Sequence, residues 1–143
     1  MYSKKEKGDI GLVKTIANFT EERVHVSLPI SEHLKYDLIA EKDGICKRVQ
    51  VRFTTENNGT LSVKLKSVWS DRKGNHILKR EKGDFDILAV YSPSNDKVYF
   101  VDDKSFENST AICLRLKKST GNNHHTIRNA EDYENCNDMW NGG

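Results

Sequence analysis

The chain has 143 residues, of which 36% are hydrophobic and 31% are charged, and its formal net charge is +2. This length and composition predict a single domain over residues 1–143 with one modest core. The three cysteines lack the spacing of a disulfide framework or a zinc site. No apolar run has the length of a signal-peptide core or of a membrane span, so we expect a cytoplasmic protein.

An amphipathic helix over about residues 3–21 is the first element that the sequence predicts. Its inner face would consist of apolar residues at helical spacing: Ile10, Val13, Ile16, Ala17 and either Phe19 or Thr20. A short strand over residues 24–28 follows and ends at Pro29. Two longer strands, over residues 36–41 and 45–54, flank a tight turn and form a hairpin.

The second half of the chain is predicted to contain further strands and a closing helix. Alternating apolar and polar residues indicate strands over 59–69, 85–91, 97–101 and 111–116, with the weaker segment 76–82 as a candidate partner for the first of these. The helix would cover about residues 127–140. These elements predict an α/β fold, with a mixed β-sheet flanked by N- and C-terminal helices.

Basic residues are concentrated between about residues 60 and 82, where seven lysines and arginines outnumber two acidic residues. One side of this segment is apolar, with Leu61, Val63 and Leu65, and the other side is polar and basic. An extended two-stranded basic ribbon fits the DNA major groove, and its cations contact phosphates. The candidate DNA-binding residues here and in a second basic stretch are Ser62, Lys64, Lys66, Arg72, Lys73, Lys79, Arg80, Arg115, Lys117 and Lys118. A charged edge strand, in which lysines block edge-to-edge pairing, is the alternative interpretation.

A polar triplet, Asp37, Gln50 and Arg52, lies on the predicted hairpin. Phosphodiester hydrolysis with a divalent ion needs clustered oxygen ligands and a cation near the reacting phosphate. Gln50 and Arg52 point to one face of their strand, and Asp37 lies on the neighbouring strand. Asp37, Gln50 and the Val51 backbone carbonyl are therefore candidate ligands for Mg²⁺ or Mn²⁺, with Arg52 as a catalytic cation. Taken singly, each of the three side chains is better explained as an ordinary solvent-facing residue.

Several motifs follow one another in a consistent order along nearly the whole chain: KGDIG, VSLP, YDLIAEKDG, RVQVRF, FDILAVYSP, VYFV, AICLRL and NAEDYE. In this order the chain resembles the PD-(D/E)xK nuclease superfamily. It is most similar to the branch of small bacterial group I intron-encoded homing endonucleases, in which Gln replaces the second acid. The resemblance implies a restriction-endonuclease-like core and sequence-specific, Mg²⁺-dependent cleavage of double-stranded DNA. It also implies catalytic roles for Asp37, Gln50 and Arg52.

Two positions depart from the family pattern. The helix position that usually carries Glu is Leu12 here, and Asp9, one turn earlier, is the candidate replacement. Arg52 stands at the family's Lys position, and a guanidinium stays protonated at neutral pH, so it cannot act as a base. A site with the single carboxylate of Asp37 would hold Mg²⁺ weakly until DNA phosphates complete it. Both departures are expected to impair catalysis.

One chain offers one site, whereas cutting a duplex requires an attack on each strand, so we expect a homodimer or homotetramer. Tyr133, Met139 and Trp140 of the closing helix, or the first helix, are candidate interface residues, and core packing explains them equally well. Two other functions stay open. One is a catalytically weakened or inactive sequence-specific DNA-binding protein on the same fold, and the other is a nuclease selective for DNA junctions.

Overall fold

The computed structural model describes residues 1–71, 74–79, 84–106, 110–117 and 128–141, with the backbone alone for 66–71 and 74–79. Its helices are α1 (Lys4–Glu21) and the short 3₁₀ helices η1 (Asp103–Phe106), η2 (Ala130–Tyr133) and η3 (Cys136–Trp140). Its strands are β1 (His25–Ser27), β2 (Leu38–Lys42), β3 (Ile45–Phe53), β4 (Thr60–Lys64), β5 (Lys66–Asp71), β6 (Gly74–Lys79), β7 (Ile87–Ser92), β8 (Lys97–Asp102), β9 (Ala111–Arg115) and β10 (Arg128–Asn129). Within this described part, every helix is too short or too polar to cross a membrane.

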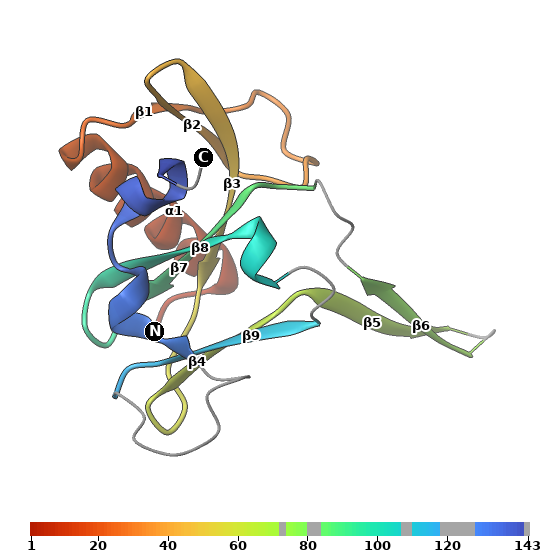
Figure 1. Ribbon diagram of the computed structural model, residues 1–143. Helices are drawn as coiled ribbons and strands as arrows, with labels where there is room; N and C mark the ends of the chain where they lie inside the picture. Colours follow the sequence, from red (N-terminus) through yellow and green to blue (C-terminus); the bar gives the residue numbers. More distant parts are fainter. Residues whose placement is uncertain (72–73, 80–83, 107–109, 118–127, 142–143) are drawn as a thin grey trace.

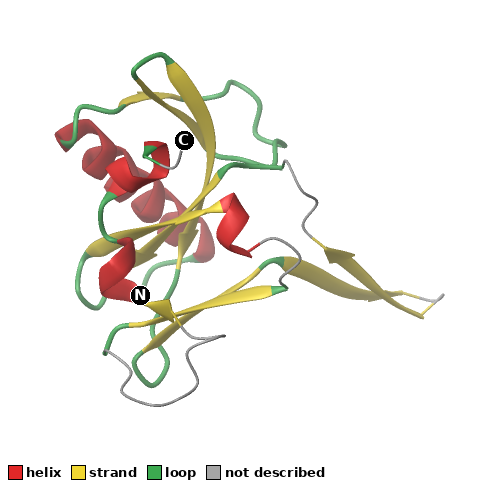
Figure 2. Ribbon diagram, in the orientation of Figure 1, coloured by secondary structure: helices red, strands yellow, loops and turns green. Residues whose placement is uncertain are grey.

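The strands form two β-sheets and a separate ribbon (Figure 1; Figure 2). The larger sheet has the order β1-β2-β3-β7-β8, and its neighbours are antiparallel except for the parallel pair β3 and β7. The smaller sheet has the order β10-β9-β4. Strands β5 and β6 form an antiparallel ribbon that extends away from both sheets in Figure 1. The structure confirms the predicted hairpin of β2 and β3. Residues 76–79 of the predicted segment 76–82 pair with β5, as expected, and its residues 80–82 lie outside the described part of the chain.

Local hydrogen bonds set the ends of α1. The Ser3 hydroxyl accepts the Glu6 N–H, and the Glu6 carboxylate accepts the Ser3 N–H, so the helix begins with a capping box. At the other end, the N–H of Glu22 donates to the carbonyls of Asn18 and Phe19. The helix predicted over residues 3–21 is confirmed.

The buried face of α1 agrees with the prediction in part, because Phe19 is fully buried and Ile10 and Ile16 pack against the first core. Val13 is 62% exposed and Ala17 is also exposed, whereas Gly11, Thr15 and Phe19 are buried at a spacing of four residues. Thr15 can be buried because its hydroxyl donates to the Gly11 carbonyl at 2.8 Å. The apolar pattern missed Gly11 and Thr15 because neither residue carries a hydrophobic signal, although both are buried.

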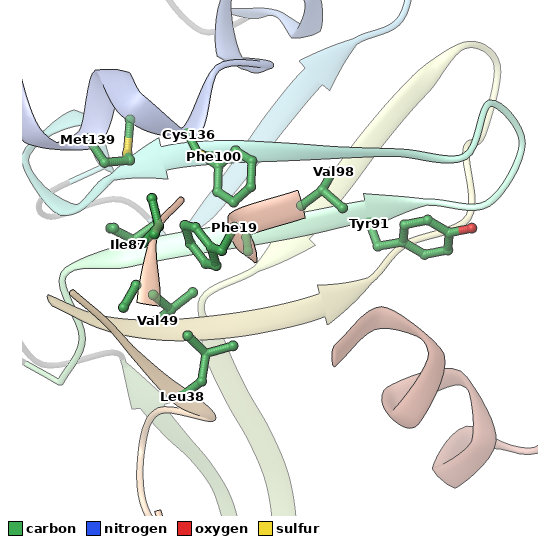
Figure 3. Close-up of a cluster of buried hydrophobic side chains, with 12 residues drawn as sticks. Phe19, Leu38, Val49, Ile87, Tyr91, Val98, Phe100, Cys136 and Met139 are labelled. Atoms are coloured by element: carbon green, nitrogen blue, oxygen red, sulfur yellow. The ribbon is translucent and has the colours of Figure 1, made fainter. Parts of the chain in front are cut away.

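The first hydrophobic core lies between α1 and the larger sheet (Figure 3). Phe19, Leu38, Val49 and Phe100 are fully buried in it. The Phe19 ring lies 5.0 Å from that of Phe100 and packs edge-on against Trp140 at 6.2 Å, measured between ring centres. Helix α1 is therefore fixed against the larger sheet, whose strand β3 carries most of the candidate site.

A second core lies on the opposite face of the larger sheet, against the smaller sheet. Leu88 and Val90 of β7 are buried there together with Leu61, Val63 and Leu65 from the β4 segment. The apolar side predicted for segment 59–69 is thus confirmed for these three residues. The two cores share β7 and β8, so the larger sheet is covered on both faces.

The closing segment does not form the single predicted helix over residues 127–140. It forms β10, η2 and η3 instead. The break lies at Asn135, whose side chain accepts the Asn137 N–H and caps η3. An asparagine side chain competes in this way with the helical backbone. Cys136 and Met139 are buried, so Met139 packs inside its own chain rather than at a surface.

The same segment also fastens the β2–β3 hairpin. The Lys47 ammonium donates to the Met139 carbonyl at 2.6 Å, and the Trp140 indole N–H donates to the Ile45 carbonyl at 3.1 Å. Lys47 also lies over the Trp140 ring at 6.0 Å from its centre. The end of the chain therefore closes over the hairpin that carries Gln50.

Gly8 and Gly11 are predicted to respond oppositely to a larger side chain. A Cβ at Gly11 would lie 3.4 Å from Cγ1 of Val51, whereas a Cβ at Gly8 would meet nothing within 4 Å. Gly11→Val should lower the free energy of unfolding by about 1–3 kcal/mol through overpacking. Gly8→Ala should raise it by about 0.5–1 kcal/mol through helix propensity. Urea unfolding followed by circular dichroism measures both, and a stabilised Gly11→Val would contradict the close approach.

Candidate active site

Asp37 lies just before β2, against the backbone of β3. Its Oδ2 accepts the Val51 N–H at 2.7 Å, and its own N–H donates to the Val49 carbonyl at 2.8 Å. The regular ladder of β2 and β3 begins only with the pair Leu38 and Val49. The Asp37 side chain therefore takes the place of the main-chain partner that a longer β2 would have given to Val51. Its second oxygen, Oδ1, accepts no hydrogen bond from a described residue.

The Val51 carbonyl belongs to the same strand edge. In an extended strand the N–H and C=O of one residue point to the same side, so this carbonyl points toward the side on which Asp37 lies. Strand β2 begins at Leu38 and does not reach that far along β3. The structure thus brings together two oxygen donors, the Asp37 carboxylate and the Val51 carbonyl, at an edge that β2 leaves uncovered.

Gln50 and Arg52 flank Val51 on the face of the sheet opposite α1. In the parallel β3–β7 ladder, Gln50 pairs with Leu88 and Arg52 pairs with Val90. Leu88 and Val90 face the smaller sheet, so the two site residues point to that side. Gln50 is half-buried and Arg52 is exposed. Neither side chain has a hydrogen-bond or ion-pair partner among the described residues.

The donor types fit a hard divalent cation such as Mg²⁺ or Mn²⁺. Carboxylate, amide and carbonyl oxygens are the ligands that these ions prefer, and Asp37, Gln50 and Val51 offer one of each. No group of three His, Cys, Asp or Glu that could hold a metal occurs among the described residues. An ion here would therefore depend on neutral protein oxygens and on oxygens supplied by a substrate.

Helix α1 brings no carboxylate to this site. Leu12 packs against the first core, and Asp9 is exposed on the outer side of the helix, where it borders a hollow with Val13. Asp9 therefore does not lie where it could replace the glutamate of the family pattern, whose position is occupied by Leu12 in this chain. Lys7 of this helix contacts the end of β3, but on the α1 face of the sheet, where its ammonium lies 5.9 Å from the centre of the Phe53 ring.

Three further residues missed by the sequence analysis lie beside the triplet: Tyr36, Arg48 and Asp86. The Asp86 carboxylate accepts the Arg48 backbone N–H at 2.8 Å and the guanidinium Nε and Nη2 at 3.3 Å each. The guanidinium carbon lies 6.0 Å from the centre of the Tyr36 ring. Alternation along β3 could have identified Arg48, because it stands two residues before Gln50.

The charge of Asp86 is stabilised by this arrangement. Burial alone would raise the pKa of Asp86, but the hydrogen bonds and charge of Arg48 outweigh burial and lower it below its ordinary value. Because the pKa of Asp86 is lowered in the folded state, its ionised carboxylate stabilises the fold, and this contribution is complete at a pH above the ordinary carboxyl pKa. That contribution is lost as the pH falls through the lowered value.

The candidate DNA-binding residues that the structure describes lie on the smaller sheet or next to it. Ser62 and Lys64 are exposed on β4, and they pair with Cys113 and Ala111 of β9. At the end of β9, Arg115 is half-buried, and Lys117, two residues further on, is exposed. Arg72, Lys73, Arg80 and Lys118 lie outside the described residues, and of Lys66 and Lys79 the backbone alone is described, in β5 and β6.

Comparison with known proteins identifies the architecture. The model of a family described as PD-(D/E)XK endonuclease matches residues 2–136. Among solved structures, a bacterial homing endonuclease, I-Ssp6803I, superposes with a TM-score of 0.72. The two chains are 22% identical, and the match covers 97% of this chain and 91% of the other. At that identity the likeness shows the fold, and it confirms the predicted mixed α/β class. No curated protein sequence matches the chain.

The family model covers almost the whole chain. Within that range the Asp37 carboxylate contacts β3 at the Val51 N–H, between Gln50 and Arg52. PD-(D/E)XK nucleases generally use divalent metal ions, and the oxygen donors of this site are of the matching kind. The chain belongs to the PD-(D/E)XK endonuclease family.

Proposed function

We propose that this protein is a sequence-specific, Mg²⁺-dependent endonuclease of the homing type that hydrolyses phosphodiester bonds in double-stranded DNA. The observation that carries the proposal is the contact between the Asp37 carboxylate and the Val51 N–H, between Gln50 and Arg52 on the neighbouring strand. Membership of an endonuclease family supports it. A solved structure with the same fold is that of a bacterial homing endonuclease.

Each residue of the site has a distinct role in this proposal. Asp37, Gln50 and the Val51 carbonyl would hold Mg²⁺ or Mn²⁺ through oxygen atoms. The bound ion would supply Lewis-acid activation of the phosphate and of the attacking water. Arg52 contributes a permanent positive charge for the phosphate, in the transition state above all. Because it stays protonated, the proton of the attacking water must leave to solvent or to the phosphate itself.

Recognition of DNA is assigned to the outer side of the smaller sheet and to the β5–β6 ribbon. Ser62 and Lys64 are exposed on β4, and the chain continues from β4 directly into the ribbon. Gln50 and Arg52 point to the side of the larger sheet on which β4 packs. A duplex lying along β4 and the ribbon would therefore approach the site from the side of its catalytic cation.

The active assembly is proposed to be a homodimer or homotetramer in the cytoplasm. One chain carries one candidate site, whereas a double-strand break requires two attacks. A two-fold assembly would also double the surface that reads DNA and would favour a partly palindromic target.

A second function is favoured by Arg52 and Leu12. Both replace groups that the family resemblance leads one to expect, so the chain could have kept DNA recognition while losing cleavage. This alternative is a sequence-specific DNA-binding protein on the nuclease fold. It differs from the first proposal in one outcome only, which is whether the bound duplex is cut in the presence of Mg²⁺.

Asp37→Asn separates catalysis from binding. Asparagine keeps an oxygen for the Val51 N–H but removes the charge, so cleavage of a library of duplex sites with Mg²⁺ should fall by at least about 100-fold. The variant should still bind the same sites in a gel-shift assay. Loss of both cutting and binding in the variant would show that Asp37 is a structural residue.

The wild type distinguishes the three functions in the same assays. Binding of duplex sites without cutting would identify a DNA-binding protein, and preference for branched DNA would indicate a junction nuclease.

Arg52→Lys tests the effect of the arginine that stands at the family's lysine position. A lysine ammonium can lose its proton and is a more compact charge than a guanidinium, so single-turnover cleavage should rise by about tenfold or more. Site affinity should stay the same, because the exchange preserves the charge. Unchanged or slower cleavage would show that Arg52 already serves the site as well as a lysine can.

Lys64→Ala tests the DNA surface. If Lys64 contacts a DNA phosphate, its replacement by alanine should reduce the magnitude of the slope of log affinity against log salt concentration by about one. The reduction should be the same for target and non-target duplexes. Lys14→Ala is the matched control, because Lys14 lies on α1, on the other side of the larger sheet, where it pairs with Asp96 at 2.9 Å. Equal slopes for the wild type and both variants would remove Lys64 from the DNA interface.

A further inference from the structure

Asp86 holds Arg48 by its side chain and its main chain together. In addition to accepting three hydrogen bonds from Arg48, Asp86 donates its own N–H to the Arg48 carbonyl at 2.9 Å. The two residues meet just before the first pair of the parallel ladder, Val49 and Ile87. A planar guanidinium that is bound through both Nε and Nη2 has its orientation fixed.

Arg48 connects this pair to the residue that precedes the candidate metal ligand. The Tyr36 ring lies within cation–π distance of the Arg48 guanidinium and also packs against the second core. Asp37 stands outside the β2 ladder, and its backbone N–H is bound to Val49 alone. The placement of Tyr36 therefore has a direct effect on where the Asp37 carboxylate lies.

We propose that Tyr36, Arg48 and Asp86 form a latch that positions the Asp37 carboxylate for divalent-ion binding. This inference rests on the proposed function, to which it adds three positioning residues. Asp37 is the single carboxylate of the donor set, so its displacement removes the strongest attraction for the ion. Residues that orient metal ligands typically change metal affinity by about 10- to 100-fold when they are mutated.

A titration of the full chain with Mn²⁺, followed by the electron paramagnetic resonance signal of the free ion, tests the latch. Asp86→Asn removes the charge that orients Arg48 and is expected to weaken Mn²⁺ binding by about tenfold. Tyr36→Leu keeps an apolar side chain but removes the ring face, and the same loss is expected. Tyr36→Phe keeps the ring face and should bind Mn²⁺ within about twofold of the wild type.

Glu134→Gln is the matched control for the loss of an ion pair. Glu134 pairs with Lys97 at 2.7 Å, and their side chains are 41% and 51% exposed, close to the 36% and 38% of Asp86 and Arg48. This pair makes no contact with the triplet among the described residues, so the variant should keep the Mn²⁺ affinity of the wild type. Urea unfolding confirms which variants are folded under the conditions of the titration.

The outcomes separate the latch from the site itself. Wild-type affinity in Asp86→Asn and Tyr36→Leu, together with weaker binding by Asp37→Asn, would overturn the latch and leave the metal site intact. Equal Mn²⁺ binding by the wild type and Asp37→Asn would overturn the metal site, and the latch with it. If Asp86→Asn does not fold, the latch is tested by comparing the Mn²⁺ affinities of Tyr36→Leu and Tyr36→Phe. Equal affinities of these two variants would contradict the latch.

Discussion

The N–H of Val51 is the constraint on which the candidate site depends. The main-chain ladder of β2 begins at Leu38, so this donor would lack a protein partner if Asp37 did not accept its hydrogen bond. The bond lies at an exposed part of the sheet edge, and a backbone N–H that donates to a carboxylate makes a charge-assisted hydrogen bond, which is stronger than a neutral one. The same contact holds the acid between Gln50 and Arg52. One hydrogen bond therefore both completes the strand edge and positions the candidate ligand.

The charges around Asp37 give the site an unusual balance. The single carboxylate of the donor set, that of Asp37, lies beside the strand that carries Arg52, while the charge of Arg48 is taken up by Asp86. One carboxylate that is offset by one cation attracts a free divalent ion only weakly. In the proposed function, the phosphates of bound DNA would therefore supply oxygens that complete the metal site.

Much of this could be predicted from the sequence, and the failures have physical reasons. Alternation along β3 correctly put Gln50 and Arg52 on one face, because strand side chains follow a period of two whatever their neighbours are. The buried face of α1 was predicted correctly for Phe19, Ile10 and Ile16 but not for Val13 and Ala17, which are exposed, and it omitted the buried Gly11 and Thr15 because they carry no hydrophobic signal. The closing helix was wrong because Asn135 caps a new turn within an otherwise helical pattern. The latch could not be predicted from spacing, since Asp86 reaches Arg48 only through the pairing of strands 38 residues apart.

The hydrogen bonds from Lys47 and Trp140 have a consequence for the order in which the fold can form during synthesis. The ribosome makes β2 and β3 by residue 53, whereas η3, which fastens their hairpin, is made only at residues 136–140. Cys136 and Met139 also fill the first core from this later segment. A nascent polypeptide that has not reached residue 136 thus carries its hairpin on a partly open core.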